Sequence, residues 1–467
     1  DNWIWPRHTG DFSMFRVYAS KDNRPAAYSP QNVPYRPKKH FSISTKGVKE
    51  GDFTMIYGFP GNTQEYILSD AVAYIAERSD PAKIAVRTGR LDIITKAQES
   101  DPALRIHYAA KHASIANAWK KWQGEALGID RRGTVAAKFD YETQFGLWSV
   151  GRPEYAGVVM GLRAEYDRIM DAYFAYEITR ETLSTLPAAY TPEERAEECF
   201  ARRKFAEQAL WRHAFREYGR CPKVYRTPSY AEGMARYKSP EAYADALFEA
   251  VWEGSDSVTM QPAVRLREET KRMLDHISWM LGTKSLRNLN SKILNELYTT
   301  YIKGLREWDR ERAFYPDANL TLRVAYGSVA GYEYADGEYH KPQTTLDGII
   351  AKDNPEIYDY DIPQSLRDLY ASKNYGRWGT VIDGRRTVPV CFLATNHTTG
   401  GNSGSPVLNA GGELIGINFD RTWRSTMSDI AYDPAICRNI AVDIRYVLFV
   451  VDRVGGAGYL LKEMTLK

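Results

Sequence analysis

Residues 398–406 read Thr-Thr-Gly-Gly-Asn-Ser-Gly-Ser-Pro. Glycines stand on both sides of the Asn402-Ser403 pair, so the backbone can turn sharply there and expose the Ser403 hydroxyl. A strand is predicted directly afterwards, over 405–408. The Asn-Ala-Gly-Gly sequence of 409–412 then predicts a hairpin turn into a second strand over 413–419. A serine at a tight turn in front of a β-hairpin indicates a nucleophile more strongly than a surface turn.

This loop resembles the nucleophile loop of chymotrypsin-like serine proteases, which reads Gly-Asp-Ser-Gly-Gly-Pro. Asn402 replaces the usual Asp and Ser405 replaces a Gly, so the match is to the general form. In that arrangement the backbone amides of Gly401 and Ser403 point at the oxyanion that develops during acyl transfer. The loop is not the Gly-x-Ser-x-Gly elbow of α/β-hydrolases, because Ser405 stands where the second glycine belongs.

A serine nucleophile needs a base and an orienting carboxylate. Residues 9–17 place Asp11 directly before a mostly apolar segment, which predicts a carboxylate at the start of a strand. Asp1 is a competing candidate, and a turn residue after Gly10 is the alternative role for Asp11. Of the eight histidines only His8 precedes Asp11, and it is too close to face Asp11 from a separate strand. We therefore expect the base to lie upstream of this chain, which would make the chain a fragment of a longer protein.

The predicted secondary structure changes twice along the chain. Short strand-like segments begin it, at 12–18, 41–44 and 53–57. A helical region follows from about residue 69 to 312. Strands are predicted again after this region, at 320–326, 387–394, 405–408 and 413–419. The last segment, 438–454, is expected to end in a helix. The pattern indicates a β domain that is interrupted by a large helical insertion.

Two patterns inside the helical region make detailed predictions. Residues 191–194, Thr-Pro-Glu-Glu, have the form of a capping box and predict a helix from about 192 to 218 that ends at Gly219. Cys199 then lies roughly 25–30 Å from Cys221, too far for a disulfide. Four apolar residues with the spacing of one helix face predict core positions; they are Leu162, Tyr166, Ile169 and Tyr173.

Composition excludes several classes of protein. Hydrophobic residues make up 43% and charged residues 26% of the 467 residues, which excludes a disordered or fibrous chain. The formal net charge is only +3, so charge-driven binding of nucleic acid is not expected. The chain has no apolar run of about 18 residues, so no membrane-spanning helix is expected. No Cys/His cluster has metal-ligand spacing, and we expect neither a metal nor a cofactor.

Four stretches together resemble one family. They are 1–12 (Asp-Asn-Trp-Ile-Trp-Pro-Arg-His-Thr-Gly-Asp-Phe), 58–61 (Gly-Phe-Pro-Gly), 398–406, and 443–448 (Asp-Ile-Arg-Tyr-Val-Leu). The chain is similar to the dipeptidyl-peptidase 7 and 11 family, chymotrypsin-clan exopeptidases of Gram-negative bacteria. The resemblance extends over nearly the whole chain.

The resemblance implies an α+β fold, a chymotrypsin-like double β-barrel with a large inserted α-helical domain. Residues 1–68 would be part of the first catalytic barrel, and 69–319 would form the helical insertion. Residues 320–467 would form the second barrel with a C-terminal helix. The resemblance also implies a homodimer in the periplasm or at the cell surface, with peptides that have a free N-terminus as substrates.

The same resemblance assigns roles to individual residues. Ser403 would be the nucleophile and Asp11 the triad carboxylate. Releasing dipeptides requires a carboxylate and amide oxygens that hold the substrate's α-ammonium at a fixed distance from the scissile bond. The residues implied for this site are Asp420, Asn2 and Asn117 around the ammonium, with Trp3 and Phe419 lining the site. From the sequence alone, a helix-surface position is the favoured role for Asn117.

Arg421 bears on specificity. A guanidinium in the primary pocket would pair with an acidic side chain, ideally through two hydrogen bonds. The resemblance implies that Arg at this position marks the dipeptidyl-peptidase 11 type, which cleaves after Asp or Glu, whereas a lone Arg at a strand end is otherwise a surface residue. Two alternatives stay open, a chymotrypsin-like endopeptidase and a non-catalytic helical binding protein with a degenerate protease domain.

Overall fold

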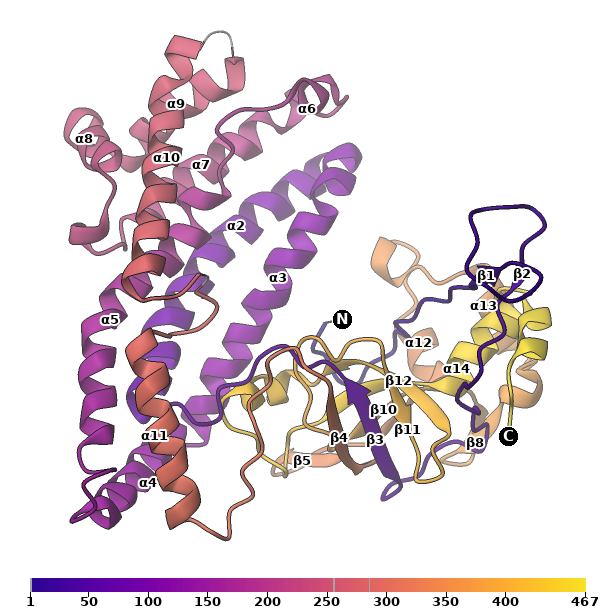
Figure 1. Cartoon of the computed structure of the whole chain (residues 1–467). Coiled ribbons are helices and arrows are strands. Elements are labelled where there is room, and N and C mark those ends of the chain that lie inside the picture. Colours follow the sequence, from indigo (N-terminus) through magenta and orange to yellow (C-terminus); the bar gives the residue numbers. More distant parts are fainter. Residues whose placement is uncertain (1, 255–256, 285) are drawn as a thin grey trace. The chain divides into compact units, whose positions relative to one another are not determined.

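The structure is a computed structural model that describes residues 2–254, 257–284 and 286–467 (Figure 1). The chain divides into two compact units, which we call the β unit (Asp1–Glu65 and Pro316–Lys467) and the helical unit (Tyr66–Tyr315). Each unit has its own hydrophobic core. Among the described residues, no helix is both long and apolar enough to cross a membrane.

The β unit is built on an antiparallel sheet of seven strands. In sheet order the strands are β4 (Arg323–Ser328), β3 (Phe53–Gly58), β11 (Ser405–Leu408), β12 (Leu414–Arg421), β13 (Asn439–Asp443), β10 (Pro389–Ala394) and β7 (Gln343–Thr345). A bridge between Val329 and Ala394 joins the chain after β4 to the end of β10, so the sheet curls into a half-barrel. β3 comes from the region expected in a first barrel, and it pairs here with β4 and β11.

Short strand pairs and helices complete the β unit. The pairs are β1 (Tyr18–Ala19) with β2 (Val33–Pro34), β5 (Tyr332–Ala335) with β6 (Glu338–His340), and β8 (Thr380–Ile382) with β9 (Arg385–Thr387). The helices are α12 (Leu346–Ala351), α13 (Gln364–Ala371) and α14 (Ile444–Phe449), followed by the π-helical turn η8 (Val450–Val454). The expected helix within 438–454 is therefore confirmed.

β10 and β13 are the most buried strands of the sheet, since every residue of both strands is buried. β10 reads Pro-Val-Cys-Phe-Leu-Ala, and each of its residues is buried. A continuous apolar run of this kind is typical of a strand with no solvent face. Phe392 of β10 is completely buried and belongs to a core cluster that also contains Val407 of β11 and Ala441 of β13.

The strand predictions near the nucleophile are confirmed. β11 matches 405–408, β12 covers 413–419 and extends to Arg421, and β3 covers 53–57. Asn409 closes the predicted hairpin turn: its Oδ1 accepts a hydrogen bond from the Gly411 N–H at 2.9 Å.

Two strand predictions near the N-terminus are wrong. Residues 11–17 form no strand, and only Tyr18–Ala19 pair, so Asp11 does not start a strand. The apolar side chains of this segment stay exposed, at 89% for Phe15 and 65% for Val17. Within 41–44, only Ile43 makes isolated bridges. Alternating apolar residues predict a strand only where a neighbouring strand takes up their hydrogen bonds and their apolar face.

The helical unit contains the long helices of the chain. They are α1 (Ser69–Tyr74), α2 (Asp80–Ser100), α3 (Pro102–Arg131), α4 (Thr134–Ser149), α5 (Val158–Glu181), α7 (Lys204–Tyr218), α8 (Pro228–Tyr237), α9 (Pro240–Glu253), α10 (Ser257–Met280) and α11 (Lys292–Trp308). Shorter segments are the π-helical turn η1 (Ile75–Ser79), the 3-10 turn η2 (Leu183–Thr185) and α6 (Pro192–Ala196). The predicted apolar stripe on α5 is confirmed, since all four of its residues are buried in the core of the unit; they are Leu162, Tyr166, Ile169 and Tyr173.

The prediction of one helix from 192 to 218 is wrong in its middle. The capping box at Thr191 is present and starts α6, but this helix ends at Ala196, and α7 begins only at Lys204. Phe200, in the break, stacks on Trp252 with ring centroids 4.2 Å apart. This tertiary contact outweighs local helix propensity. All four cysteines are free thiols.

We expect Phe392→Ala to destabilise the β unit by about 3–5 kcal/mol, because the substitution opens a cavity in a fully buried core. The matched control is Phe15→Ala, since Phe15 is 89% exposed and its loss should change stability by less than about 0.5 kcal/mol. Urea unfolding of both variants measures the difference. Equal unfolding free energies for the two variants would contradict the packing described here.

Candidate active site

Ser403 lies in a tight turn directly before β11. Its side chain is exposed, and its hydroxyl donates a hydrogen bond to the Phe419 carbonyl at 3.2 Å. Gly401 and Gly404 have φ angles of +105° and +83°. Residues with side chains adopt such angles at a cost, so glycine at both positions makes the turn possible.

Asn402 holds the turn in shape from inside. Its side chain is buried, and its Oδ1 accepts the Thr399 N–H at 3.0 Å. The Asn402 carbonyl accepts a hydrogen bond from Asn418 Nδ2 at 3.2 Å, and the Gly404 N–H donates to the Asn418 carbonyl at 2.8 Å. Asn402, the departure from the usual Asp, is therefore a structural residue of the loop.

The turn 58–61, Gly-Phe-Pro-Gly, packs against the same loop. The Gly61 N–H donates to the Gly400 carbonyl at 2.6 Å. A Cβ atom on Gly58 would lie 2.4 Å from both Asn402 Nδ2 and Ser405 Oγ, and a Cβ on Gly401 would lie 2.4 Å from the Phe59 carbonyl oxygen. The two segments, more than 300 residues apart, require glycine at their contact because the backbones approach so closely.

The backbone amides of Gly401 and Ser403 belong to the same turn as the exposed hydroxyl of Ser403. Within the described residues neither N–H donates a hydrogen bond. An exposed hydroxyl beside two such amides is the arrangement that stabilises an oxyanion in acyl transfer.

Asp420, on β12, is the centre of a buried charged cluster. Its Oδ2 accepts the Trp3 N–H at 2.9 Å and forms an ion pair with Arg7 Nη1 at 2.9 Å. Its Oδ1 accepts the Arg421 N–H at 2.8 Å. Burial raises the pKa of the Asp420 carboxyl above its ordinary value, while these hydrogen bonds and Arg7 oppose the rise.

Sequence analysis missed Arg7. Its guanidinium is almost fully buried, pairs with Asp420 and lies over the Phe419 ring, 5.0 Å from the centroid. The only signal in the sequence was its place within 1–12, between Trp3 and Asp11. Trp3 has φ +68°, and its carbonyl accepts the Trp423 N–H at 2.6 Å, so residues around Trp3 are held against the end of β12.

Arg421 is buried rather than exposed at a strand end. Its guanidinium makes two hydrogen bonds to Asp429, Nη1 to Oδ1 at 2.6 Å and Nη2 to Oδ2 at 2.7 Å. Nη1 also donates to the Thr398 carbonyl and to Ser428 Oγ, and the guanidinium lies 5.4 Å from the Trp3 ring centroid. Asp429 is a second residue that was not predicted from the sequence. It lies at the end of the 3-10 helix η7 (Trp423–Asp429), whose fold brings it opposite Arg421.

The predicted residues fall into different parts of the structure. Asn2, Trp3, Phe419, Asp420 and Arg421 belong to the β unit, as do Ser403 and Asp11. Asn117 is an exposed residue of α3 in the helical unit. Asp11 is exposed, and among the described residues (2–254, 257–284 and 286–467) it makes no hydrogen bond to Ser403.

Two histidines lie near these residues in the sequence, and both have a lowered pKa. His397 Nε2 is 2.9 Å from the Ser428 carbonyl, its ring packs on Tyr432, and burial lowers its pKa. Burial, with a smaller contribution from Lys352, lowers the pKa of His8 to about 4. Each is therefore held as the neutral imidazole near pH 7.

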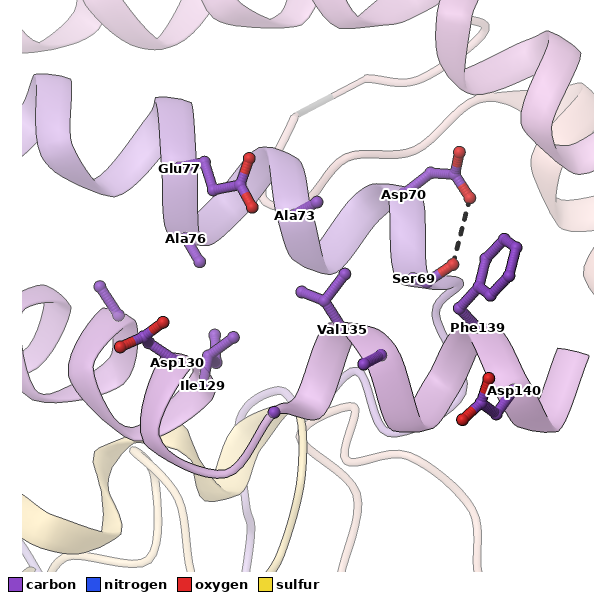
Figure 2. A pocket seen from close by; sticks show the side chains of 13 residues that line it. Ser69, Asp70, Ala73, Ala76, Glu77, Ile129, Asp130, Val135, Phe139 and Asp140 are labelled. Carbon is purple, nitrogen blue, oxygen red and sulfur yellow. Dashed lines mark hydrogen bonds between the residues drawn. The ribbon is translucent and has the colours of Figure 1, made fainter.

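The helical unit has features that could be mistaken for sites. A cavity of about 690 Å³ lies among α1, α3 and α4, and none of the predicted site residues lines it (Figure 2). His107, Glu197 and Cys199 bring potential metal ligands within 4.8 Å of one another. Arg203 Nη1 lies 2.7 Å from His107 Nε2 and 3.4 Å from Glu197 Oε2. A guanidinium thus already supplies the positive charge in that cluster.

We expect the stability of the β unit to fall as the pH is lowered from about 6.5 to about 4. His8 has a lower pKa folded than unfolded, so in this range the unfolded state binds more protons. Its Nδ1 is buried and has no hydrogen-bond partner among the described residues, so nothing in the fold supports the charged form. Urea unfolding across this range should show a smaller slope with pH for His8→Gln. An unchanged slope would mean that other groups carry the dependence.

Several known proteins are similar to this chain over its whole length. The Peptidase S46 family model matches residues 1–199 and 192–466. The Asp/Glu-specific dipeptidyl-peptidase of Capnocytophaga gingivalis is 41% identical, with 100% of this chain and 70% of that protein covered. The corresponding protein of Flavobacterium psychrophilum is also 41% identical, and a dipeptidyl-peptidase 7 of Phocaeicola vulgatus is 33% identical, both at the same coverage.

Solved structures give the same result. The crystal structure of Porphyromonas endodontalis DPP11 in complex with the dipeptide Arg-Glu matches with a TM-score of 0.84 at 32% identity. The match covers 100% of this chain and 72% of that one. The family model, the relatives and the fold all lead to one conclusion: the chain belongs to the Peptidase S46 family.

Proposed function

We propose that this protein is a serine dipeptidyl-peptidase that releases dipeptides ending in Asp or Glu from the N-terminus of peptides. The observation that carries the proposal is the placement of Ser403, Asp420 and Arg421 around one loop and one strand end. Relatives 41% identical over the whole chain are named Asp/Glu-specific dipeptidyl-peptidases, and DPP11 structures contain the dipeptides Arg-Glu and Arg-Asp.

Ser403 is the proposed nucleophile, and its hydroxyl oxygen attacks the scissile carbonyl. The carbonyl oxygen becomes an oxyanion, which the amides of Gly401 and Ser403 stabilise. Asp11 is the proposed carboxylate that orients the base and stabilises its protonated form. We assign the base to a histidine outside this sequence, because His8 and His397 are buried in other environments.

The α-ammonium of the substrate is proposed to bind near Asp420, with Asn2 and Asn117 as further acceptors and Trp3 and Phe419 as lining. Arg7 balances the charge of Asp420 through an ion pair. The pair therefore does not leave an isolated buried carboxylate, which would be costly. A fixed distance from this ammonium site to Ser403 would set the product length at two residues.

Arg421 is the proposed partner of the acidic side chain before the scissile bond. Asp429 holds the Arg421 guanidinium with two hydrogen bonds. A second carboxylate would share this cation, whereas an apolar side chain would gain no charge-assisted hydrogen bond there. Arg421 thus favours Asp and Glu over residues of similar size.

The larger organisation is also part of the proposal. We assign residues 1–68 to a first chymotrypsin-like barrel, 69–319 to a helical insertion, and 320–467 to a second barrel with a C-terminal helix. The half-barrel around β10 and β13 supports the second assignment. We further propose a homodimer in the periplasm or at the cell surface.

Ser403→Ala in the complete protein should lower the rate of dipeptide release by about 10⁶-fold, because loss of a triad serine has an effect of this size. The control is Ser405→Ala: its hydroxyl is two residues away and buried, so activity should remain. Release of dipeptidyl-coumarin substrates measures both. Full activity of Ser403→Ala would exclude Ser403 as the nucleophile.

Arg421→Gly should reduce kcat/KM for substrates ending in Asp or Glu by at least about a hundredfold, since a charge-assisted contact is lost in a desolvated site. Activity after Leu should stay the same or rise. Arg424→Gly is the matched control. Arg424 lies three residues after Arg421, but its guanidinium stacks on the Tyr334 ring. A preference for Leu in the unmodified protein would show that Arg421 does not set the specificity.

A further inference from the structure

A second, basic cavity lies in the helical unit. It has a volume of about 420 Å³ and lies between the end of α5, the turn η2 and one face of α10. It shares no residue with the proposed active site. On α10, its lining residues recur at the spacing of a single helix face; they are Arg267, Thr270, Lys271, Leu274, Asp275 and Ser278.

The charge around this cavity is unbalanced. Four cations line it, Arg180 from α5, Arg267 and Lys271 from α10, and Lys284 from the segment that follows, against the single carboxylate of Asp275. Within the described residues none of the four cations has an ion-pair partner within 4.0 Å. Arg267 and Lys271 are also four residues apart on one helix, a spacing at which like charges repel.

Other arginines of the same helix are paired. Arg265 contacts Glu232 at 3.1 Å and Glu269 at 2.9 Å, and Arg272 lies 3.8 Å from Glu268. Among the described residues, acidic side chains pair with these two arginines of α10, whereas the one carboxylate at the cavity, Asp275, makes no ion pair within 4.0 Å with the four cations. The cations there are left for a ligand or for solvent.

Thr270 provides an independent sign of a ligand. It is 4% exposed, and its Oγ1 has no hydrogen-bond partner among the described residues. A buried hydroxyl without a partner is costly, and such groups call for a specific explanation. Two further hydroxyl residues, Ser184 and Ser278, line the same cavity and could donate to the same ligand.

We propose that this cavity binds a small phosphoryl anion, such as a diphosphate or a phosphate ester with at least two negative charges. The four cations and one carboxylate give the lining a net positive charge, which suits the negative charge of such a ligand. Arginine, lysine and hydroxyl donors around one space suit the many acceptor oxygens of a phosphoryl group. The exposed positions of Arg180, Arg267 and Lys271 leave the cavity open to entry from solvent.

Inorganic pyrophosphate is the probe. Isothermal titration calorimetry of the whole chain at constant ionic strength should give a Kd below about 1 mM. Arg267→Gln and Lys271→Gln should each weaken binding by about tenfold, because each removes one charge-assisted hydrogen bond. Arg272→Gln is the matched control, with the same substitution on the same helix outside the cavity, and should leave Kd unchanged.

Thr270→Val separates binding from folding. Because the hydroxyl has no partner in the protein, the variant without ligand should unfold at the same or a higher temperature. Pyrophosphate should then raise its unfolding temperature less than that of the unmodified chain. A variant that loses stability without ligand would show that the hydroxyl is satisfied within the fold.

Two results with the protein and its variants would overturn the proposal. The first is that pyrophosphate does not bind. The second is that Arg267→Gln and Arg272→Gln weaken binding equally, which would indicate a general charge effect. A third test compares two anions. Citrate, a tricarboxylate, should bind at least about tenfold more weakly than pyrophosphate. Equal affinity for citrate would exclude the preference for phosphoryl groups.

Discussion

The ion pair between Arg7 and Asp420 is the interaction on which the proposed site depends. Both groups are nearly excluded from water, and neither would be stable there alone, because an unpaired buried charge is far more costly than a pair. The pair joins the first residues of the chain to the end of β12, more than 400 positions later. Trp3, held to Asp420 through its backbone N–H, then lies over Arg421. In the proposed function, substrate specificity and substrate anchoring would both depend on these few hydrogen bonds.

A second constraint is steric. The nucleophile turn and the 58–61 turn approach so closely that Gly58 and Gly401 have no room for a Cβ atom. This contact connects β3 to the loop that follows β10, and it fixes the position of Ser403 relative to the sheet. Packing of this kind tolerates no extra methyl group, since protein interiors are as dense as organic crystals. The Gly-Phe-Pro-Gly stretch is therefore as much a part of the active-site scaffold as the serine loop.

Cationic side chains are paired differently in the two units. In the β unit each buried arginine of the site has a carboxylate partner, Arg7 with Asp420 and Arg421 with Asp429. In the proposed function, the acidic side chain of a substrate would join a pair that already exists, and discrimination would depend on how a second carboxylate shares the guanidinium. In the helical unit, the cations around the basic cavity have no such partners within the part of the chain that the structure describes. A ligand there would supply the missing negative charge instead of sharing it.

The sequence by itself was enough to predict short turns, helix faces and the loop around Ser403. The hairpin after Ser403 and the stripe on α5 follow from short-range periodicity and turn residues, which act within a few positions of the chain. The nucleophile loop was recognisable for the same reason, since its glycines are local requirements. Only the tertiary structure decided what lies next to Asp420 and Arg421, because Arg7 reaches Asp420 from more than 400 positions earlier and the 3-10 helix Trp423–Asp429 brings Asp429 opposite Arg421. It also decided that residues 11–17 form no strand and that the helix after Thr191 breaks at Phe200, because a strand needs a partner and an aromatic stack can outweigh helix propensity.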